Sequence, residues 1–323
     1  MQKYKNILIT GANSFLGTNV VLELASRQIA TRAIVRHTNP TIEGVETLDI
    51  YKGDLSSLAE LTQAAMGCDC IVHIASITSQ SLPRYKLYRD FNVGMMENVI
   101  AAARATGIKR IVYVSSANTI GNGTGPDDLA DETREATPPF SRMFYGRSKV
   151  EAEAVLRRAT DLDYTIVNPT FMLGAYDNKP SSGALIMMGY ARRFVFVPVG
   201  GKNIVSVHAA ASALCNAIEV GRRGENYLLS GESITIRDFM RLVNPHAHII
   251  IMPRLLLIAA GYVGDVLRFF GLHTALCANN MRVICQREYY SGSKAARELG
   301  LARTSISEVI DQAVCWFRLH DML

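Results

Sequence analysis

The sequence predicts an α/β protein built on a doubly wound parallel sheet, followed by a smaller and mostly helical lobe. Through the first 170 residues, short apolar runs bounded by turn residues alternate with segments of helical periodicity. Continuously apolar strands that are separated by helices pair in parallel and are covered on both faces. After about residue 170 this alternation loosens. We therefore expect a sheet domain at 1–170 and a second lobe at 171–323, with part of about 203–222 returning to the sheet domain.

The individual elements follow from the same patterns, in chain order. In the first half we expect strands at 6–10, 32–35, 45–51, 70–74, 110–114 and 164–167, and helices at 15–27, 58–66, 90–105 and 145–159. In the second half we expect helices at 183–193, 209–220, 236–243, 255–270 and 307–319, with short strands at 203–207 and 226–229. Because the sequence contains no flexible linker, the second lobe should pack directly on the first.

A glycine-rich turn joins the first expected strand to the first expected helix. It reads Thr10-Gly11-Ala12-Asn13-Ser14-Phe15-Leu16-Gly17. Glycines in such a turn let the backbone approach a pyrophosphate, which the positive end of the following helix attracts. The alternative is a tight turn that binds no ligand. We expect a dinucleotide to contact Gly11, Asn13, Ser14, Phe15 and Leu16.

The end of the second expected strand indicates which dinucleotide binds. An acidic residue about 20 positions past the last glycine would bind a ribose 2′-hydroxyl, whereas an arginine would bind a 2′-phosphate. Counting on from Gly17 leads to Arg36, and the next acidic residue is Glu43. A guanidinium pairs well with a phosphate. Arg36 therefore favours NADP(H) over NAD(H), the alternative being a solvated arginine at the end of a strand.

A tyrosine and a lysine four residues apart form the candidate reactive group. Tyr145 and Lys149 lie on one face of an expected helix, and a neighbouring ammonium lowers the pKa of a phenol. Ser116 follows the strand at 110–114, lies 29 residues upstream of Tyr145, and can donate a hydrogen bond to a carbonyl oxygen. A second pair, Tyr290 and Lys294, has no such serine about 30 residues before it. We assign the acid–base chemistry to the first pair.

Together these motifs resemble the extended short-chain dehydrogenases/reductases of the NAD-dependent epimerase/dehydratase superfamily. The glycine turn is similar to their T-G-x-x-G-x-x-G, with Ser14 in place of the middle glycine. The segment from Asn168 to Gly174 resembles the N-P-T/S-x-x-x-G of the dihydroflavonol-reductase-like and 3β-hydroxysteroid-dehydrogenase-like branch. The resemblance covers nearly the whole chain. It implies a Rossmann fold and a nicotinamide cofactor, and it allows a homodimer.

The resemblance also implies roles for further residues. Asp54 and Leu55 would contact the adenine edge, and Pro169 and Met172 would pass the nicotinamide. Asn92 matches a helix asparagine that supports a water relay to the lysine in relatives, although a surface asparagine is the alternative. The remaining residues implied beside the cofactor are Ala75 and Ser76, at the end of the fourth strand, and Tyr145 and Lys149.

Two histidines receive no catalytic role from these patterns. His73 is expected to pack within the fourth strand. His208 stands in Val205-Ser206-Val207-His208-Ala209-Ala210-Ala211, where relatives often read V-x-V-x-D-V-A, so this chain lacks an acidic residue at that junction. His208 is either a structural histidine or part of the substrate cleft.

These expectations combine into an NADP(H)-dependent oxidoreductase that interconverts a ketone or aldehyde and a secondary alcohol on a small organic substrate. Ser116 would orient the carbonyl, Tyr145 would move the proton, and Lys149 would lower the phenol pKa and hold the ribose. The alternatives are a nucleotide-sugar epimerase or dehydratase and a non-catalytic dinucleotide-binding sensor or scaffold. Substrate should contact 76–88, 171–193 and parts of 245–277, and the apolar segments 173–176 and 185–190 are either a cleft wall or core.

Composition excludes several other classes. The net charge is +5, and the longest basic runs are pairs of arginines, so no nucleic-acid-binding tract is present. The six cysteines lack the spacing of a zinc site, and we expect no metal. Residues 1–10 lack a secretory apolar core, so we expect a cytoplasmic protein. The apolar stretch 249–264 is broken by Pro253 and Arg254, so we expect no membrane span. The helix at 255–270 is core, a dimer interface or a membrane-surface contact.

Overall fold

A seven-stranded parallel sheet forms the centre of the computed structural model, which describes residues 3–37, 39–79, 82–272, 274 and 276–323. Its order is β10-β6-β5-β4-β1-β2-β3, and every neighbouring pair is parallel. The strands are β1 (Asn6–Thr10), β2 (Ala30–Val35), β3 (Leu48–Lys52), β4 (Cys70–His73), β5 (Arg110–Val114), β6 (Asp163–Pro169) and β10 (Asn226–Leu229). This confirms the predicted doubly wound Rossmann fold.

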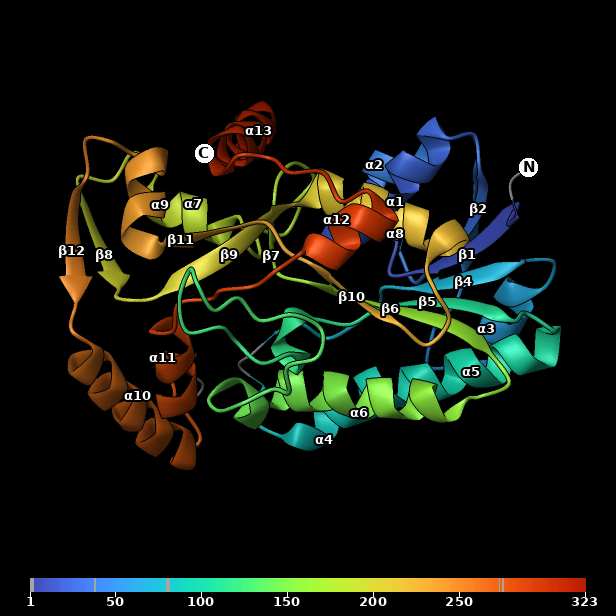
Figure 1. The fold of residues 1–323 in the computed structure, drawn as a ribbon, viewed down its shortest axis with the longest axis horizontal. Helices are drawn as coiled ribbons and strands as arrows, with labels where there is room; N and C mark the ends of the chain where they lie inside the picture. The colour runs from blue at the N-terminus through green and yellow to red at the C-terminus, as the bar shows by residue number, and fades with distance from the viewer. Residues whose placement is uncertain (1–2, 38, 80–81, 273, 275) are drawn as a thin grey trace.

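Helices cover both faces of this sheet (Figure 1). One face packs against α1 (Phe15–Ser26), α8 (Val207–Val220) and α12 (Ser293–Leu299). The other face packs against α3 (Leu58–Ala65), α5 (Gly94–Thr106) and α6 (Phe144–Arg158). The short α2 (Pro40–Glu43) follows β2. Strands covered on both sides carry apolar residues at every position, which explains the continuous runs in the sequence.

The helix expected at 90–105 begins earlier and is interrupted. Its observed parts are α4 (Tyr85–Tyr88), a π-helical turn at Arg89–Val93, and α5. A π-turn inserts one extra residue into the hydrogen-bond ladder and re-aims the side chains within it. Asn92 lies in this turn and is buried, so its side chain points into the protein and not to the surface.

The second lobe contains more strand than the sequence predicts. A three-stranded sheet has the order β11-β9-β7, and β12 pairs with β8 in a two-stranded sheet. The strands are β7 (Phe171–Leu173), β8 (Phe194–Pro198), β9 (Gly201–Ser206), β11 (Glu232–Thr235) and β12 (His248–Met252). The helices are α7 (Ala184–Gly189), α9 (Ile236–Val243), α10 (Arg254–Phe269), α11 (Ala278–Ile284) and α13 (Ile306–Leu319). Four of these strands were not predicted, because each is short and pairs only with residues distant in the chain.

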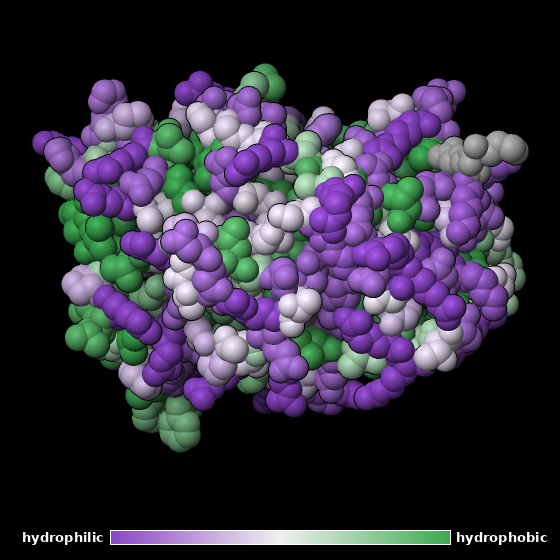
Figure 2. Space-filling view, viewed as in Figure 1, coloured by the Kyte–Doolittle hydropathy of each residue, from purple (hydrophilic) through white to green (hydrophobic). Residues whose placement is uncertain are grey.

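The α10 helix lies on the outside of the second lobe. Only Gly261 and Gly264 are buried in it, so the interpretation of this segment as core is wrong. In Figure 2 the surface over the central sheet is mainly hydrophilic, whereas hydrophobic residues gather at the end where β8, β12 and α10 lie. Within the described part of the chain, none of the helices has both the length and the apolar character to cross a bilayer.

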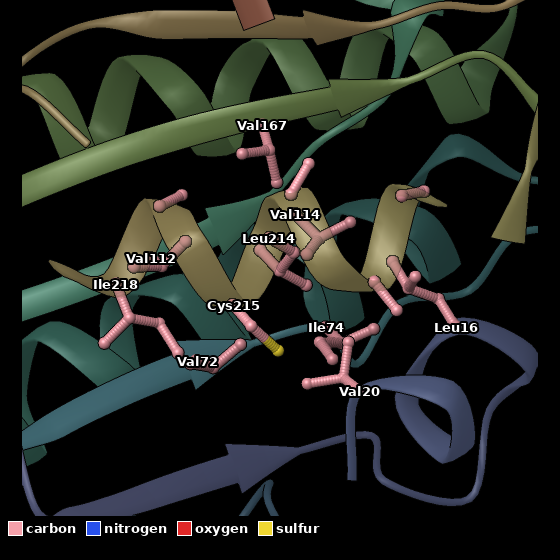
Figure 3. Packing of buried hydrophobic residues seen from close by; sticks show 14 of the residues in the cluster. Leu16, Val20, Val72, Ile74, Val112, Val114, Val167, Leu214, Cys215 and Ile218 are labelled. Carbon is pink, nitrogen blue, oxygen red and sulfur yellow. The ribbon is translucent and has the colours of Figure 1, made fainter. Parts of the chain in front are cut away.

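The α8 helix comes from the C-terminal half of the chain but packs on the central sheet. Figure 3 shows Leu214, Cys215 and Ile218 of α8 against valines of the neighbouring strands, with Val20 of α1 alongside. Ser206 caps the helix, since its side chain accepts a hydrogen bond from the amide of Ala209. This packing holds the second lobe close to the sheet. Both halves of the chain therefore contribute residues at the carboxyl ends of the strands.

Candidate active site

A cleft of about 1050 Å³ lies at the carboxyl ends of the strands. Strand order reverses between β1 and β4, and ligands of doubly wound sheets bind at this kind of switch point. The second lobe closes the cleft with residues of β7 and of the loop after it. The predicted cofactor residues all line this cleft: Gly11, Asn13, Ser14, Phe15, Leu16, Arg36, Asp54, Leu55, Ala75, Ser76, Tyr145, Lys149, Pro169 and Met172.

The glycine turn is shaped by two close backbone approaches. Gly11 has φ +78°, and a Cβ there would lie 2.6 Å from the amide nitrogen of Ala75. A Cβ on Gly17 would lie 2.0 Å from the carbonyl oxygen of Gly11. Ser14 caps α1 by accepting a hydrogen bond from the amide of Gly17 at 3.0 Å. A side chain on either glycine would clash with this backbone, so the two glycines allow the tight turn that leaves the N-terminus of α1 facing the cleft, as a pyrophosphate requires.

Arg36 lies at the edge of the same cleft, just past the end of β2. The Asn13 side chain donates a hydrogen bond to the carbonyl of His37, which ties the turn after β2 to the glycine turn. Hydrogen bonds from Ser56 lower the pKa of Asp54, and the charge of Arg36 lowers it further. Arg36 is exposed. Arg36 therefore places an exposed cationic side chain at this end of the cleft.

Ser116 and Tyr145 meet at the floor of the cleft. Ser116 follows the end of β5, and its hydroxyl oxygen accepts a hydrogen bond from the amide of Asn118 at 3.2 Å. Burial raises the pKa of Tyr145 to about 12, and a hydrogen bond with Ser116 opposes that rise. The phenol is therefore protonated at neutral pH and can act as an acid. The hydroxyl groups of Ser116 and Tyr145 thus line the same cleft as the glycine turn, as the spacing of the two residues predicts.

Lys149 is fully buried beneath the cleft floor. Its Nζ donates a hydrogen bond to the carbonyl of Val114 at 2.8 Å and lies 4.8 Å from the centre of the Tyr113 ring. Burial lowers the pKa of Lys149 to about 7, and the charge of Glu153 opposes that shift. The sequence predicts that Lys149 lowers the pKa of Tyr145. In the structure the hydrogen bond with Ser116 lowers the pKa of Tyr145, and the part expected of Lys149 stays a prediction.

Glu153 is a residue of this site that sequence reasoning missed. It lies one helical turn after Lys149 on α6 and is 8% exposed. Its carboxylate accepts hydrogen bonds from the Thr119 hydroxyl at 2.9 Å and the Asn168 amide at 3.0 Å. The negative charge stabilises the protonated form of Lys149. The repeat of four residues from Tyr145 through Lys149 to Glu153 is the signal that could have found it.

Asn92 supports the site from behind and does not line the cleft. Its amide oxygen accepts hydrogen bonds from the amide of Ile77 at 2.8 Å and the Ser76 hydroxyl at 3.2 Å. Its amide nitrogen donates to the Ser148 hydroxyl at 2.9 Å, which in turn donates to the carbonyl of Tyr145 at 2.7 Å. Asn92 therefore joins the end of β4 to the helix that carries Tyr145. In this structure it is a positioning residue.

Comparison with known proteins agrees with this geometry. A model of the NAD dependent epimerase/dehydratase family matches residues 7–195. The chain belongs to this family. It is 31% identical to a putative dihydroflavonol 4-reductase of Synechocystis sp., over 97% of this chain and 94% of that one. It is 30% identical to sterol demethylase protein B of Methylococcus capsulatus, over 98% and 99%.

Among solved structures, the crystal structure of gox2253 is similar to this chain. The two superpose with a TM-score of 0.84 at 27% identity, and the match covers 99% of each chain. The predicted resemblance to extended short-chain dehydrogenases/reductases is thus confirmed. Members of this family bind a nicotinamide dinucleotide, which fits the cradle formed by Gly11 and Gly17.

The second tyrosine–lysine pair lies outside the family's cleft. Tyr290 is buried in a separate apolar cluster, and α12 begins only after it, at Ser293. The ammonium of Lys294 contacts Glu225 at 2.7 Å and the carbonyl of Asn226 at 2.6 Å. Neither member of the pair lines the cleft. The structure therefore brings together the first pair with Ser116 and keeps the second pair apart.

The two histidines also lie away from the reacting end of the cleft. His208 is exposed near the start of α8, with its Nε2 3.9 Å from the carboxylate of Glu23. His73 is buried in β4, and its Nδ1 shares a hydrogen bond with the Thr10 hydroxyl at 2.7 Å. Burial and the charge of Lys149 lower the pKa of His73 to about 3, so its ring is neutral. Neither histidine lines the cleft.

The substrate end of the cleft combines apolar walls with one ion pair. Phe171, Met172 and Tyr176 line it, and the ammonium of Lys202 pairs there with the carboxylate of Glu288. The segment 185–190 does not line the cleft; its buried residue Ile186 lies in the core of the second lobe. Sequence reasoning missed the ion pair, because its two residues are 86 positions apart. Among the described residues, no cluster of ligands suited to a metal ion occurs.

Proposed function

We propose that this protein is an NADP(H)-dependent oxidoreductase that interconverts a ketone or aldehyde and a secondary alcohol. The observation that carries the proposal is that Ser116, a protonated Tyr145 and the buried Lys149 line one cleft. Dinucleotide binding alone does not require a buried acid–base pair at this position. An acid beside a second hydroxyl donor is what the reduction of a carbonyl requires.

In the direction of reduction, the Ser116 hydroxyl donates a hydrogen bond to the substrate carbonyl oxygen. The nicotinamide supplies the hydride to the carbonyl carbon when it is bound. Tyr145 then delivers its proton to the oxygen, and the alcohol leaves. In the reverse direction the phenolate accepts that proton. Because Lys149 lies beneath the floor and Glu153 favours its charged form, the lysine stabilises the phenolate left after the transfer.

The preference for NADP(H) rests on Arg36. Its guanidinium lies at the end of the cleft near Asp54, where the adenosine ribose of a dinucleotide in the glycine cradle would extend. A charge-assisted pair with a 2′-phosphate is stronger than a neutral hydrogen bond. Asp54 carries the opposite charge, but hydrogen bonds from Ser56 occupy its carboxylate. We therefore propose that the positive charge of Arg36 decides the choice of cofactor.

We also propose that the substrate is mainly apolar, with one polar group away from the reacting carbonyl. Phe171, Met172 and Tyr176 provide apolar walls, while Lys202 and Glu288 provide a polar contact. The names of the two relatives refer to a dihydroflavonol and a sterol, and both have a carbon skeleton of fused rings. Such a molecule gains its binding energy from the apolar walls and its orientation from the few polar groups.

The proposal is tested with the purified chain, NADPH or NADH, and a panel of cyclic ketones, aromatic ketones and aldehydes. Loss of NADPH absorbance with at least one ketone, together with slower reaction when NADH replaces NADPH, is the expected result. Nucleotide sugars are incubated in parallel, without added cofactor. Conversion of a nucleotide sugar to its epimer with no net change in cofactor would replace the proposal by the epimerase alternative. Tight NADPH binding without turnover on any panel member would favour the sensor or scaffold.

A further inference from the structure

The α10 helix is amphipathic in the opposite sense to an ordinary surface helix, since its large apolar side chains face outward. We call this set of side chains the apolar stripe. Helical spacing of three, four and seven places them on one face. Leu255 is 82% exposed and Phe269 is 87% exposed. The members of the apolar stripe are Leu255, Leu256, Tyr262, Val263, Val266, Phe269 and Phe270.

In the second half of α10, small and polar residues form the side that faces the protein. A Cβ on Gly261 would lie 2.7 Å from the Cα of Ala278, and the residues that bury Gly264 are equally close. Asp265 accepts a hydrogen bond from the amide of Ala278 at 3.1 Å. The Arg268 guanidinium donates to the carbonyl of Thr274 at 2.8 Å. Apart from the half-buried Leu257 and Ile258 near its start, the large apolar residues of α10 are exposed.

The exposed apolar surface continues from α10 onto the two-stranded sheet. Pro253 joins β12 directly to α10. Phe196 of β8 and Ile250 of β12 are paired across the strands, and both are exposed, with Phe194 beside them. Figure 2 shows hydrophobic residues gathered at the end of the molecule where β8, β12 and α10 lie. Contiguous exposed apolar surfaces mark sites of interaction on proteins.

The charges around this surface are almost all positive. The segments 190–200 and 244–287 contain six arginines and one aspartate, a balance of +5 that equals the net charge of the whole chain. The arginines are Arg192, Arg193, Arg254, Arg268, Arg282 and Arg287. Lysine and glutamate are absent from both segments. The region that exposes apolar side chains is therefore also the region that holds the excess of positive charge.

We propose that α10 and the outer face of β8 and β12 dock the protein on the surface of an anionic lipid bilayer. An amphipathic helix with an apolar face and flanking basic residues lies in the plane of the interface, with the apolar side chains at the boundary of headgroups and acyl chains. A second copy of the chain fits the same surface less well. A two-fold interface brings each patch against itself, so the positive charges would face one another.

Docking by this surface would place the cleft close to the bilayer. The α11 helix, which supports α10, packs through Val283 against Phe140 and Met143. Those two residues precede α6, the helix that begins at Phe144 and carries Tyr145. An apolar substrate that partitions into the bilayer would thus have a short path to the cleft. The docking itself rests on the exposed surface and its charge, and not on the proposed chemistry.

The test is sedimentation of the full chain with phosphatidylcholine vesicles that contain or lack phosphatidylglycerol. We expect binding to the anionic vesicles that weakens as salt concentration rises. The variant Phe269→Glu/Phe270→Glu should lower the partition coefficient by about tenfold or more, since two apolar side chains are removed from the interface. The matched control is Val220→Glu/Leu319→Glu, which makes the same change of charge at two exposed apolar residues elsewhere. It should keep most of the binding.

Light scattering after size exclusion and NADPH binding are measured on the same variants. Unchanged NADPH affinity in the Phe269→Glu/Phe270→Glu variant shows that it is folded. Two results would overturn the proposal: the wild-type chain could stay in the supernatant with both vesicle types, or the control could lose as much binding as the stripe variant. If the wild type binds no vesicles and the stripe variant turns a dimer into a monomer, the surface belongs to a second copy instead.

Discussion

The central sheet and the second lobe bury their apolar residues to very different extents. Helices cover both faces of the sheet, and Leu214 of α8, like Val72 of β4, is fully buried between the layers. In the second lobe, β8 buries Val195 and Val197 on one side and exposes Phe194 and Phe196 on the other. The sheet unit is thus complete within the chain. The second lobe leaves one apolar face exposed.

The same contrast applies to the chemistry. The glycine cradle, Arg36, Ser116, Tyr145 and Lys149 all belong to the sheet unit, at the ends of its strands or the starts of its helices. The second lobe adds the apolar walls and the ion pair at the substrate end. In the proposed function, rigid elements hold the reacting groups, whereas the more open lobe is free to vary with substrate. Substitutions in the two regions test this division.

The largest effect is expected in the packing of the sheet unit. Leu214→Ala removes a fully buried side chain between α8 and the strands, and should lower the free energy of unfolding by about 2–5 kcal/mol. Leu255→Ala, on the outer face of α10, should change it by less than about 0.5 kcal/mol. Urea unfolding in the absence of lipid measures both. Equal losses in the two variants would show that the second lobe is packed as tightly as the sheet.

Lys149→Met should lower turnover by about 10²-fold or more and weaken NADPH binding, because the proposed ammonium serves both. Lys294→Met, in the pair outside the cleft, should leave both quantities within about twofold. Steady-state kinetics and NADPH titration of the two variants give the comparison. Loss of turnover in Lys294→Met alone would show that the second tyrosine–lysine pair, and not the first, carries the chemistry.

The same substitution changes the pH dependence of stability. Burial lowers the pKa of Lys149 to about 7, against about 10.4 in an unfolded chain. Between these pH values the unfolded state binds more protons, so the free energy of unfolding contributed by this group rises with pH across the interval. Lys149→Met should remove that rise. Urea unfolding at a series of pH values measures this rise. An unchanged slope in the variant would show that folding does not lower the pKa of Lys149.

Arg36→Asp should weaken NADPH binding by about 1.5–3 kcal/mol, the range for a charge-assisted hydrogen bond, and should leave NADH binding little changed. Arg254→Asp, in the second lobe, makes the same change of charge away from the cleft and serves as the control. Isothermal titration with both cofactors measures the effect. Equal dissociation constants for NADPH and NADH in the unmodified protein would contradict the assignment of Arg36.

The smallest effect is expected from Glu153→Gln. The Glu153 charge holds the pKa of Lys149 above the value that burial alone would give, so its removal should lower that pKa. Any limb of the pH–rate profile that reports Lys149 should move to lower pH, by up to about one unit. Glu288→Gln, in the second lobe, should affect the KM for substrate and leave this limb in place. A limb that stays unchanged in Glu153→Gln would show that the carboxylate acts only through packing.

How much of the structure the sequence predicted also differs between local patterns and contacts between distant residues. The glycine turn, the end of β2 and the spacing of Tyr145 and Lys149 are local patterns, and each is interpretable within a few residues. The Glu153 network joins α6 to β6 through Asn168, and the pairing of β8 with β12 joins residues 54 positions apart. Such contacts depend on tertiary packing. The π-turn around Asn92 was missed because it has no distinctive periodicity, although it determines where that side chain points.

The pKa of Tyr145 was also beyond the sequence. Spacing along a helix predicts that a lysine lies near the phenol, but it does not predict how much solvent either group loses. In the structure, burial raises one pKa and lowers the other. The direction of Lys149 towards the end of β5 depends on where the strand ends relative to α6. The pKa values of groups at a buried site therefore depend on the folded structure and cannot be predicted from spacing alone.

The central claim is that Tyr145, and not Tyr290, exchanges the proton with substrate. It is tested most directly by the turnover of Tyr145→Phe and Tyr290→Phe, measured side by side with NADPH and a ketone that the unmodified protein reduces. Tyr145→Phe should lower turnover by about 10²-fold or more while NADPH affinity stays within a few fold. Tyr290→Phe should keep near-full turnover. Near-full turnover in Tyr145→Phe together with its loss in Tyr290→Phe would contradict the assignment of the site.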